Sequence, residues 1–157
     1  SINVEQEDMS VNNLFGDVVF VDGDEILTYN AHTIYNDGVW TPDIEIDPTR
    51  GYKIWLSQAK TISFEGELVD VNTPITLIGT GDASITWIGY LPQEPRSVSD
   101  VMQGVISYGQ PSKVVHPDSG LFSQYGPAGW FGTLTEMQPG EMYKITTALP
   151  GTLIYGE

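Results

Sequence analysis

The chain has 157 residues, no cysteine, and 21 acidic against 6 basic side chains, which give a formal net charge of −15. This negative charge argues against nucleic acid and anionic membranes, because both need Lys and Arg for recognition. The lack of cysteine excludes disulfides, thiol catalysis and cysteine metal sites. The length suits one domain or two small ones, and the ordinary apolar content indicates a folded chain.

The chain repeats itself with an offset of about 90 residues. The segments 40–67 and 130–157 both begin on Trp, place Pro before a turn, continue with Tyr-Lys-Ile and end on Gly-Glu. This predicts two tandem repeats, residues 1–67 and 85–157, joined by a connecting strand and turn at 68–84. Each repeat alone is too small to bury much core, so we expect a pseudo-twofold pair packed as a single integrated domain.

The first half of the chain predicts a short helix followed by strands. Ser10 is a good N-cap, and the apolar residues after it follow helical spacing: Val11, Leu14, Phe15 and Val18. Gly16 should end this helix after about two turns. Residues 48–51 then predict a hairpin turn, and residues 52–56 and 61–64 predict strands.

The connecting segment and the second half continue the same pattern. Residues 75–78 alternate in polarity and predict a strand. Ser97 is a second N-cap, with Asp100 at capping-box spacing and apolar residues at helical spacing: Val98, Val101, Met102 and Val105. A turn at 139–142 and strands at 143–145 and 152–155 follow. The predicted fold is mainly β and rich in hairpins, with one short helix per repeat.

Two motifs of the second repeat carry a resemblance to a known family. Trp87-Ile88-Gly89-Tyr90-Leu91-Pro92 and the segment 138–145, Gln-Pro-Gly-Glu-Met-Tyr-Lys-Ile, resemble a Trp-rich β-repeat found in large secreted or surface-attached bacterial proteins. Its pattern is W-x-W-I-x-[YF], a short helix, W-x-G-x-L, and P-G-x-x-Y-x-I. The second repeat fits throughout, whereas the first lacks the opening Trp strand and replaces the W-x-G step with Trp40-Thr41-Pro42.

The resemblance implies an extracellular accessory module, secreted or attached to the cell surface, beside adhesive or polysaccharide-degrading modules. It carries over no catalytic residues. Because the chain begins in the middle of the repeat pattern, we expect it to be a piece of a longer protein whose other modules are its partners. No apolar run approaches the roughly 20 residues that a membrane-spanning helix needs.

Aromatic side chains are the main candidates for ligand binding, because their flat faces stack on sugar rings. Trp55 comes first: on a strand it shares a face with Lys53, opposite Tyr52 and Ile54. The full set of candidate residues is Trp55, Lys53, Trp40, Tyr35, Asn36, Asp37, Trp130, Tyr125 and Tyr90. Alternatively, Trp55 packs against a neighbouring strand or module, and Trp40 and Trp130 with their tyrosines cap small cores.

The alternation of residues near position 90 places Trp87 and Tyr90 on opposite faces of a strand. Trp87 alternates with Ile85 and Leu91, so we expect it in the core. Tyr90 falls on the opposite face, where it is a candidate for stacking.

One acidic cluster suits a calcium ion. Asp22, Asp24 and Glu25 surround a glycine turn and offer hard oxygen ligands. The EF-hand pattern is absent, because Thr33 stands at the twelfth position where the loop needs Glu. The alternative is an exposed acidic turn. The two histidines are too isolated to indicate zinc, and no other cofactor is expected.

Nothing in the sequence predicts an enzyme. The two histidines lie in no nucleophile motif, and a carboxylate pair will occur by chance among 21 acidic residues. The leading hypothesis is a non-catalytic extracellular carbohydrate-binding module that holds a polysaccharide or cell-surface glycan by aromatic stacking. The negative charge favours neutral or basic glycans. The alternatives are a structural or adhesive spacer without a small ligand, and a protein-docking module.

Overall fold

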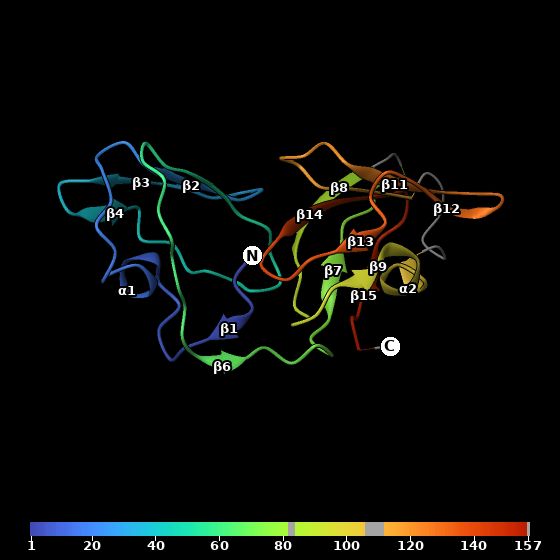
Figure 1. The fold of residues 1–157 in the computed structure, drawn as a ribbon, viewed down its shortest axis with the longest axis horizontal. Helices are drawn as coiled ribbons and strands as arrows, with labels where there is room; N and C mark the ends of the chain where they lie inside the picture. Colours follow the sequence, from blue (N-terminus) through green and yellow to red (C-terminus); the bar gives the residue numbers. More distant parts are fainter. Residues whose placement is uncertain (82–83, 106–111, 157) are drawn as a thin grey trace.

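The computed structural model describes residues 1–81, 84–105 and 112–156. It shows two lobes side by side, each with a main antiparallel sheet and one short helix (Figure 1). The sheets lie along the upper side of Figure 1, and α1 and α2 lie below them. The predicted mainly β fold is confirmed. Among the described residues, no helix has the length and apolar character that crossing a membrane requires.

The first lobe is built on a four-stranded sheet of order β4-β3-β2-β5. A two-stranded ribbon, β1 with β6, lies below it (Figure 1). The elements are β1 (Val4–Glu5), α1 (Val11–Leu14), β2 (Glu25–Leu27), β3 (His32–Asn36), β4 (Val39–Thr41), β5 (Lys53–Trp55) and β6 (Glu67–Leu68).

The second lobe is built on a five-stranded sheet of order β12-β11-β10-β14-β8. Two ribbons, β13 with β9 and β15 with β7, complete it. The elements are β7 (Ile75–Leu77), β8 (Ser84–Gly89), β9 (Arg96–Ser97), α2 (Val98–Val101), β10 (Lys113–Val115), β11 (Phe122–Gly126), β12 (Gly129–Gly132), β13 (Glu136–Met137), β14 (Met142–Thr147) and β15 (Gly151–Leu153).

The two main sheets use the same strand register. Ile26 lies opposite Ile54 in the first lobe, and Val114 lies opposite Ile145 in the second. These residues occupy matching places in the two repeated sequences. The second sheet has one strand more. In it, β14 pairs with β10 at one edge and with β8 at the other, whereas β5 of the first sheet pairs with β2 alone among the described residues.

Both predicted N-caps are confirmed. The Ser10 hydroxyl accepts the Asn13 N–H at 3.4 Å, and the Ser97 hydroxyl accepts the Asp100 N–H at 3.1 Å. These bonds satisfy backbone donors that the first helical turn leaves free. Each helix spans four residues, about one turn rather than the two predicted, and a tighter turn follows it, with hydrogen bonds from Gly16 to Asn13 and from Gln103 to Asp100.

A tyrosine explains the repeated Pro-to-Tyr spacing. The Tyr52 hydroxyl accepts the backbone N–H of Asp47 at 2.9 Å, and the Tyr143 hydroxyl accepts that of Gln138 at 2.7 Å. In both cases the donor is the residue just before the proline of the turn. Burial raises the pKa of both tyrosines, so both stay protonated at neutral pH. Each tyrosine therefore ties its strand to the turn that precedes it.

The predicted strands are present except for one. Residues 61–64 form no strand, since they pair with no other segment among the described residues. The predicted strand at 75–78 is present as β7, and it pairs with β15 of the second lobe. The expected end of the second repeat, Glu157, lies outside the described residues.

A backbone junction joins the lobes. Gly51 of the first lobe donates its N–H to the Trp87 carbonyl at 3.2 Å, and Gly89 donates to the Thr49 carbonyl at 3.0 Å. Gly89 has no room for a side chain, because a Cβ there would overlap the carbonyl oxygen of Pro48. The close approach of the two backbones therefore requires glycine at position 89.

Substitution of Gly89 tests this junction. Gly89→Ala should lower the free energy of unfolding by about 1–3 kcal/mol, because the added methyl meets a backbone oxygen that cannot turn aside. Gly104→Ala is the matched control, since its Cβ would meet no atom of the described residues within 4 Å. Urea denaturation monitored by fluorescence measures both. Equal stability of the two variants would contradict the junction.

Candidate functional site

Trp55 lies on the outer, helix-free face of the first sheet. It stands on β5 opposite Glu25, and 49% of its surface is exposed. Lys53, two residues before it, points to the same face. Across the sheet the row continues from Glu25 to Ile34 and then to Thr41. The expected partnership of Trp55 and Lys53 on one face is therefore present.

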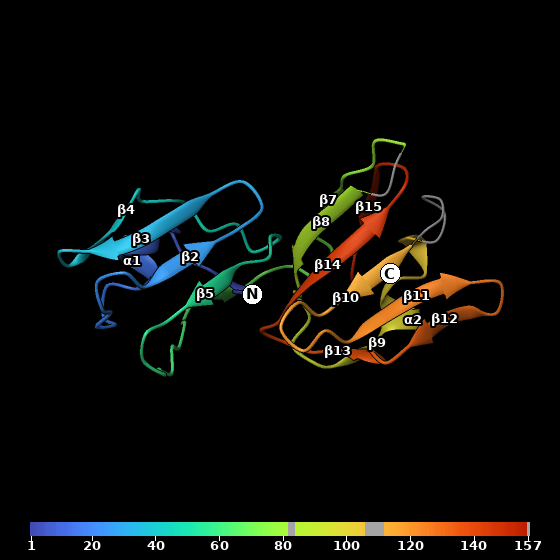
Figure 2. The same ribbon diagram turned by 90° about the horizontal axis from the view of Figure 1, so that it is seen from above.

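The second lobe displays aromatic residues on the corresponding face. Ile85, Thr146, Lys113, Gln124 and Phe131 form one cross-strand row. Phe131 is 57% exposed at the end of that row. Figure 2 looks onto both main sheets, with the two helices behind them. The helix-free faces of the two lobes thus point to the same side of the molecule.

Three of the four lysines of the chain lie on this helix-free face, and each is engaged. Lys53 forms an ion pair with Asp118 at 2.9 Å. The Lys113 ammonium lies 4.7 Å from the ring centre of Phe122, and the Lys144 ammonium lies 4.2 Å from that of Trp87. Burial, followed by the nearby Lys53, lowers the pKa of Lys144. The face is therefore not an open basic surface.

Trp40 and Trp130 lie on the inner faces of the sheets. Trp40 is 3% exposed and packs on Phe20 and Tyr35 with ring centres 4.9 and 5.4 Å apart. Trp130 is half-buried and packs on the second core, and the centre of its ring lies 5.6 Å from that of Tyr125. The nitrogen atoms of both indole rings are buried. These two Trp-Tyr pairs close the cores and do not form part of the exposed face.

Asn36 and Asp37 lie at the hairpin between β3 and β4. Asn36 is exposed and lies opposite Val39, at the end of the outer face. Asp37 has a φ of 51° and is followed by Gly38 with a φ of 89°, the positive values that tight hairpin turns require. Its N–H donates to the Asp22 carboxylate at 3.1 Å. Asp37 therefore shapes the turn, while Asn36 is available on the face.

The expectation for Trp87 and Tyr90 was wrong in both cases. Tyr90 is fully buried, and its hydroxyl donates to the Glu94 carbonyl at 2.9 Å. Burial raises the pKa of Tyr90 to about 12. Trp87 is only half-buried and faces outward beneath Lys144. Ile85 and Trp87 share one face of β8 as alternation predicts, but that face does not meet the core, and Tyr90 and Leu91, just after β8, are both buried.

The acidic residues near position 23 have separate partners. Asp24 is buried, and its carboxylate accepts the Ser57 N–H at 2.7 Å, the Ser57 hydroxyl at 2.8 Å and the Val21 N–H at 3.0 Å. Glu25 lies 3.3 Å from His32. Among the described residues, no three His, Cys, Asp or Glu side chains gather as a metal-binding group. Asp24 thus fastens the chain after β5 to the turn before β2.

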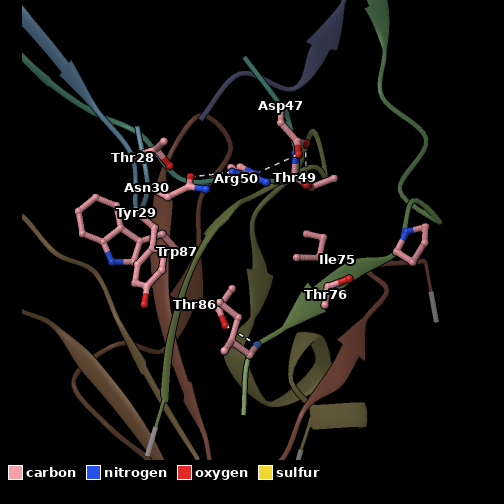
Figure 3. A pocket seen from close by; sticks show the side chains of 12 residues that line it. Thr28, Tyr29, Asn30, Asp47, Thr49, Arg50, Ile75, Thr76, Thr86 and Trp87 are labelled. Carbon is pink, nitrogen blue, oxygen red and sulfur yellow. Dashed lines mark hydrogen bonds and ion pairs between the residues drawn. The ribbon is translucent and has the colours of Figure 1, made fainter. Parts of the chain in front are cut away.

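A cleft of about 560 Å³ opens between the lobes beside this face (Figure 3). Tyr29 and Trp87 lie at the left of Figure 3, and Tyr29 is 61% exposed. Arg50 lines the cleft from the first lobe and donates to Asn30 at 2.8 Å and to Asp47 at 3.2 Å. The cleft combines aromatic faces with hydrogen-bonding groups, which is the composition of a small-molecule site.

Sequence reasoning did not identify Tyr29, Arg50 or Trp87 as site residues. Tyr29 and Arg50 lie in loops of the first lobe, whereas Trp87 belongs to the second. They meet only because the junction brings the loops of one lobe against the edge strand of the other. No local sequence motif predicts this contact between the lobes.

The comparisons with known proteins add no relative. The scan against family models, the search of curated proteins and the search of solved structures each found no match.

Asp24 should make stability depend on pH. Burial alone would raise its carboxyl pKa, but the hydrogen bonds from Ser57 and Val21 outweigh this effect, and Lys60 adds to them. The pKa of Asp24 is therefore lower in the folded state than the value of about 3.9 in the unfolded chain. Its contribution is complete above the unfolded pKa, and it is lost as pH falls through the folded pKa.

Asp24→Asn tests this dependence. The variant should lose about 2 kcal/mol of unfolding free energy at pH 7, because one hydrogen-bonded charge is removed from a buried site. Below pH 4 the difference from the wild type should shrink. Urea denaturation between pH 7 and pH 2 measures it. Asp22→Asn is the control and should change stability by less than about 0.5 kcal/mol. A constant difference at every pH would refute the assignment.

Proposed function

We propose that this chain is a non-catalytic extracellular module that binds a polysaccharide or cell-surface glycan on the helix-free face of its two sheets. The observation that carries the proposal is the position of Trp55, Trp87 and Phe131, which two separate lobes display on one side of the molecule. Exposed aromatic rings on a common face suit an extended ligand that carries a repeating apolar surface.

Polar groups for the sugar hydroxyls lie beside the aromatic rings. Glu25 and Asn36 belong to the same face as Trp55, and Asn30 and Arg50 line the cleft between the lobes. Sugar hydroxyls need donors and acceptors of this kind in addition to stacking. In this proposal a glycan lies across the face and places polar groups in the cleft.

The charge distribution favours an uncharged glycan. The chain as a whole is strongly acidic and repels sulfated or uronic polymers. The lysines of the binding face do not reverse this, because Lys53 is paired with Asp118 and the chain carries 21 acidic against 6 basic side chains. Neutral or basic polysaccharides are therefore the proposed ligand class.

The proposal also covers the architecture and the cellular setting. The matching registers of the two sheets support tandem repeats, and the packing of these repeats as a pseudo-twofold pair is part of the proposal. The resemblance to Trp-rich repeats supports a secreted or surface-attached location beside other modules of one polypeptide. Calcium is outside the proposal, because the carboxylate of Asp24 already accepts three hydrogen bonds.

Affinity electrophoresis against neutral, basic and uronic polysaccharides tests the function. We expect retardation by a neutral or basic glycan. Trp55→Ala should weaken binding about tenfold, which corresponds to the loss of about 1.4 kcal/mol of stacking. Trp55→Phe should keep most of the affinity. Leu149→Ala, which removes an exposed apolar side chain in another loop, is the control. Absence of retardation by every glycan would refute the proposal.

Acrylamide quenching separates a binding face from a structural spacer. A spacer without a ligand is expected to cover all four tryptophans, whereas Trp55 is 49% exposed and Trp40 only 3%. Trp55→Phe should therefore remove most of the readily quenched emission, and Trp40→Phe should leave it in place. Stern–Volmer constants for the wild type and both variants measure this. An unchanged constant in Trp55→Phe would favour the spacer.

A further inference from the structure

The first sheet lacks a strand that the second sheet possesses. In the second lobe, β14 lies between β10 and β8, and Ile145 pairs with Val114 on one side and Thr86 on the other. In the first lobe, β5 occupies the place of β14, but among the described residues it pairs only with β2. One edge of β5 is therefore open.

The open edge presents backbone hydrogen-bonding groups. Asp24 and Thr28, at the two ends of β2, form backbone hydrogen bonds to the β3 side. Because successive residues of a strand bond to opposite sides, Glu25 and Leu27 between them bond toward β5. Lys53 and Trp55 then bond to β2, and Ile54 directs its N–H and carbonyl to the open edge. Ile145 at the matching place is paired with Thr86 of β8. Ile54 is thus a site for an added strand.

An apolar groove of about 400 Å³ accompanies the open edge. Its lining includes Ile2, Ile26, Ile54, Ile62 and Phe64. Ile54 is 40% exposed, whereas Ile145 at the matching place is fully buried. In the second lobe β8 covers this position and itself contributes a fully buried side chain, Ile88. The difference in exposure corresponds to the strand that the first lobe lacks.

We propose that the β5 edge and this groove form a docking site for a β-strand of the β8 type, donated by another repeat of this kind. The strand would add antiparallel to β5, with an inward threonine opposite Ile54 and an aliphatic residue in the groove. Its tryptophan would lie opposite Lys53, as Trp87 lies opposite Lys144 with the ammonium 4.2 Å from the ring centre. The docking site uses the backbone edge of β5, whose side chains Lys53 and Trp55 lie on the proposed glycan-binding face, but the argument for it does not depend on glycan binding.

The second lobe is the reason for choosing this occupant. In its sheet, β8 has the required alternation and pairs with β14, which occupies the place that β5 has in the first sheet. Strand addition joins modules through main-chain hydrogen bonds, while side-chain pockets select the sequence. A repeat that donates such a strand and offers such an edge can link to further repeats.

Amide hydrogen exchange of the whole chain, with and without a synthetic peptide of residues 84–91, tests the docking site. Without peptide, the Ile54 amide should exchange much faster than that of Ile145. Saturating peptide should slow Ile54 at least about tenfold and leave Ile145 unchanged. A scrambled peptide is the control and should slow neither.

Ile54→Pro provides the matched variant. It removes the N–H aimed at the open edge together with the Ile54 side chain that lines the groove, at a position where strands tolerate proline. We expect loss of peptide binding, while the amides of β2 remain protected. If this variant fails to fold, the peptide titration on the wild type decides alone. A dimeric chain with Ile54 already protected would overturn the proposal in favour of a second copy of the chain. An unchanged Ile54 amide in millimolar peptide would overturn it outright.

Discussion

The structure depends on the backbone pairing between residues 49–51 of the first lobe and strand β8 of the second. Two hydrogen bonds, from Gly51 to Trp87 and from Gly89 to Thr49, form only because position 89 carries no side chain. This pairing sets the two sheets side by side with their helices on the same side (Figure 1). It also forms the cleft, because it brings the loop bearing Tyr29 next to Trp87.

The two lobes share the same helix caps, turns and strand register, but the main sheet of the first lobe has one strand fewer. The helix caps at Ser10 and Ser97, and the tyrosine bonds behind both turns, are the same in each. The second lobe adds β8 and buries a continuous core, whereas the first leaves Ile54 half-exposed. One sequence pattern therefore yields a closed sheet where β8 is present and an open edge where it is not.

Much of the local structure follows from the sequence, because it depends on neighbouring residues. The caps, the strand at Lys53–Trp55 and the outward face of Trp55 are of this kind. The exposure of Trp87 depends on which side of β8 meets the core, which alternation alone leaves undetermined, and alternation ends before Tyr90 and Leu91, which are both buried. Residues 61–64 have strand-like composition but no partner among the described residues. The cleft was unpredictable because it joins loops from both lobes.

The central claim is that the junction holds both helix-free faces as one rigid surface. Residual dipolar couplings of backbone amides in β2, β3 and β5, compared with those in β10, β11 and β14, test it most directly. We predict that both sets fit a single alignment tensor with the relative orientation of Figure 2. Two tensors of different magnitude would show that the lobes move independently, and would contradict a shared binding face.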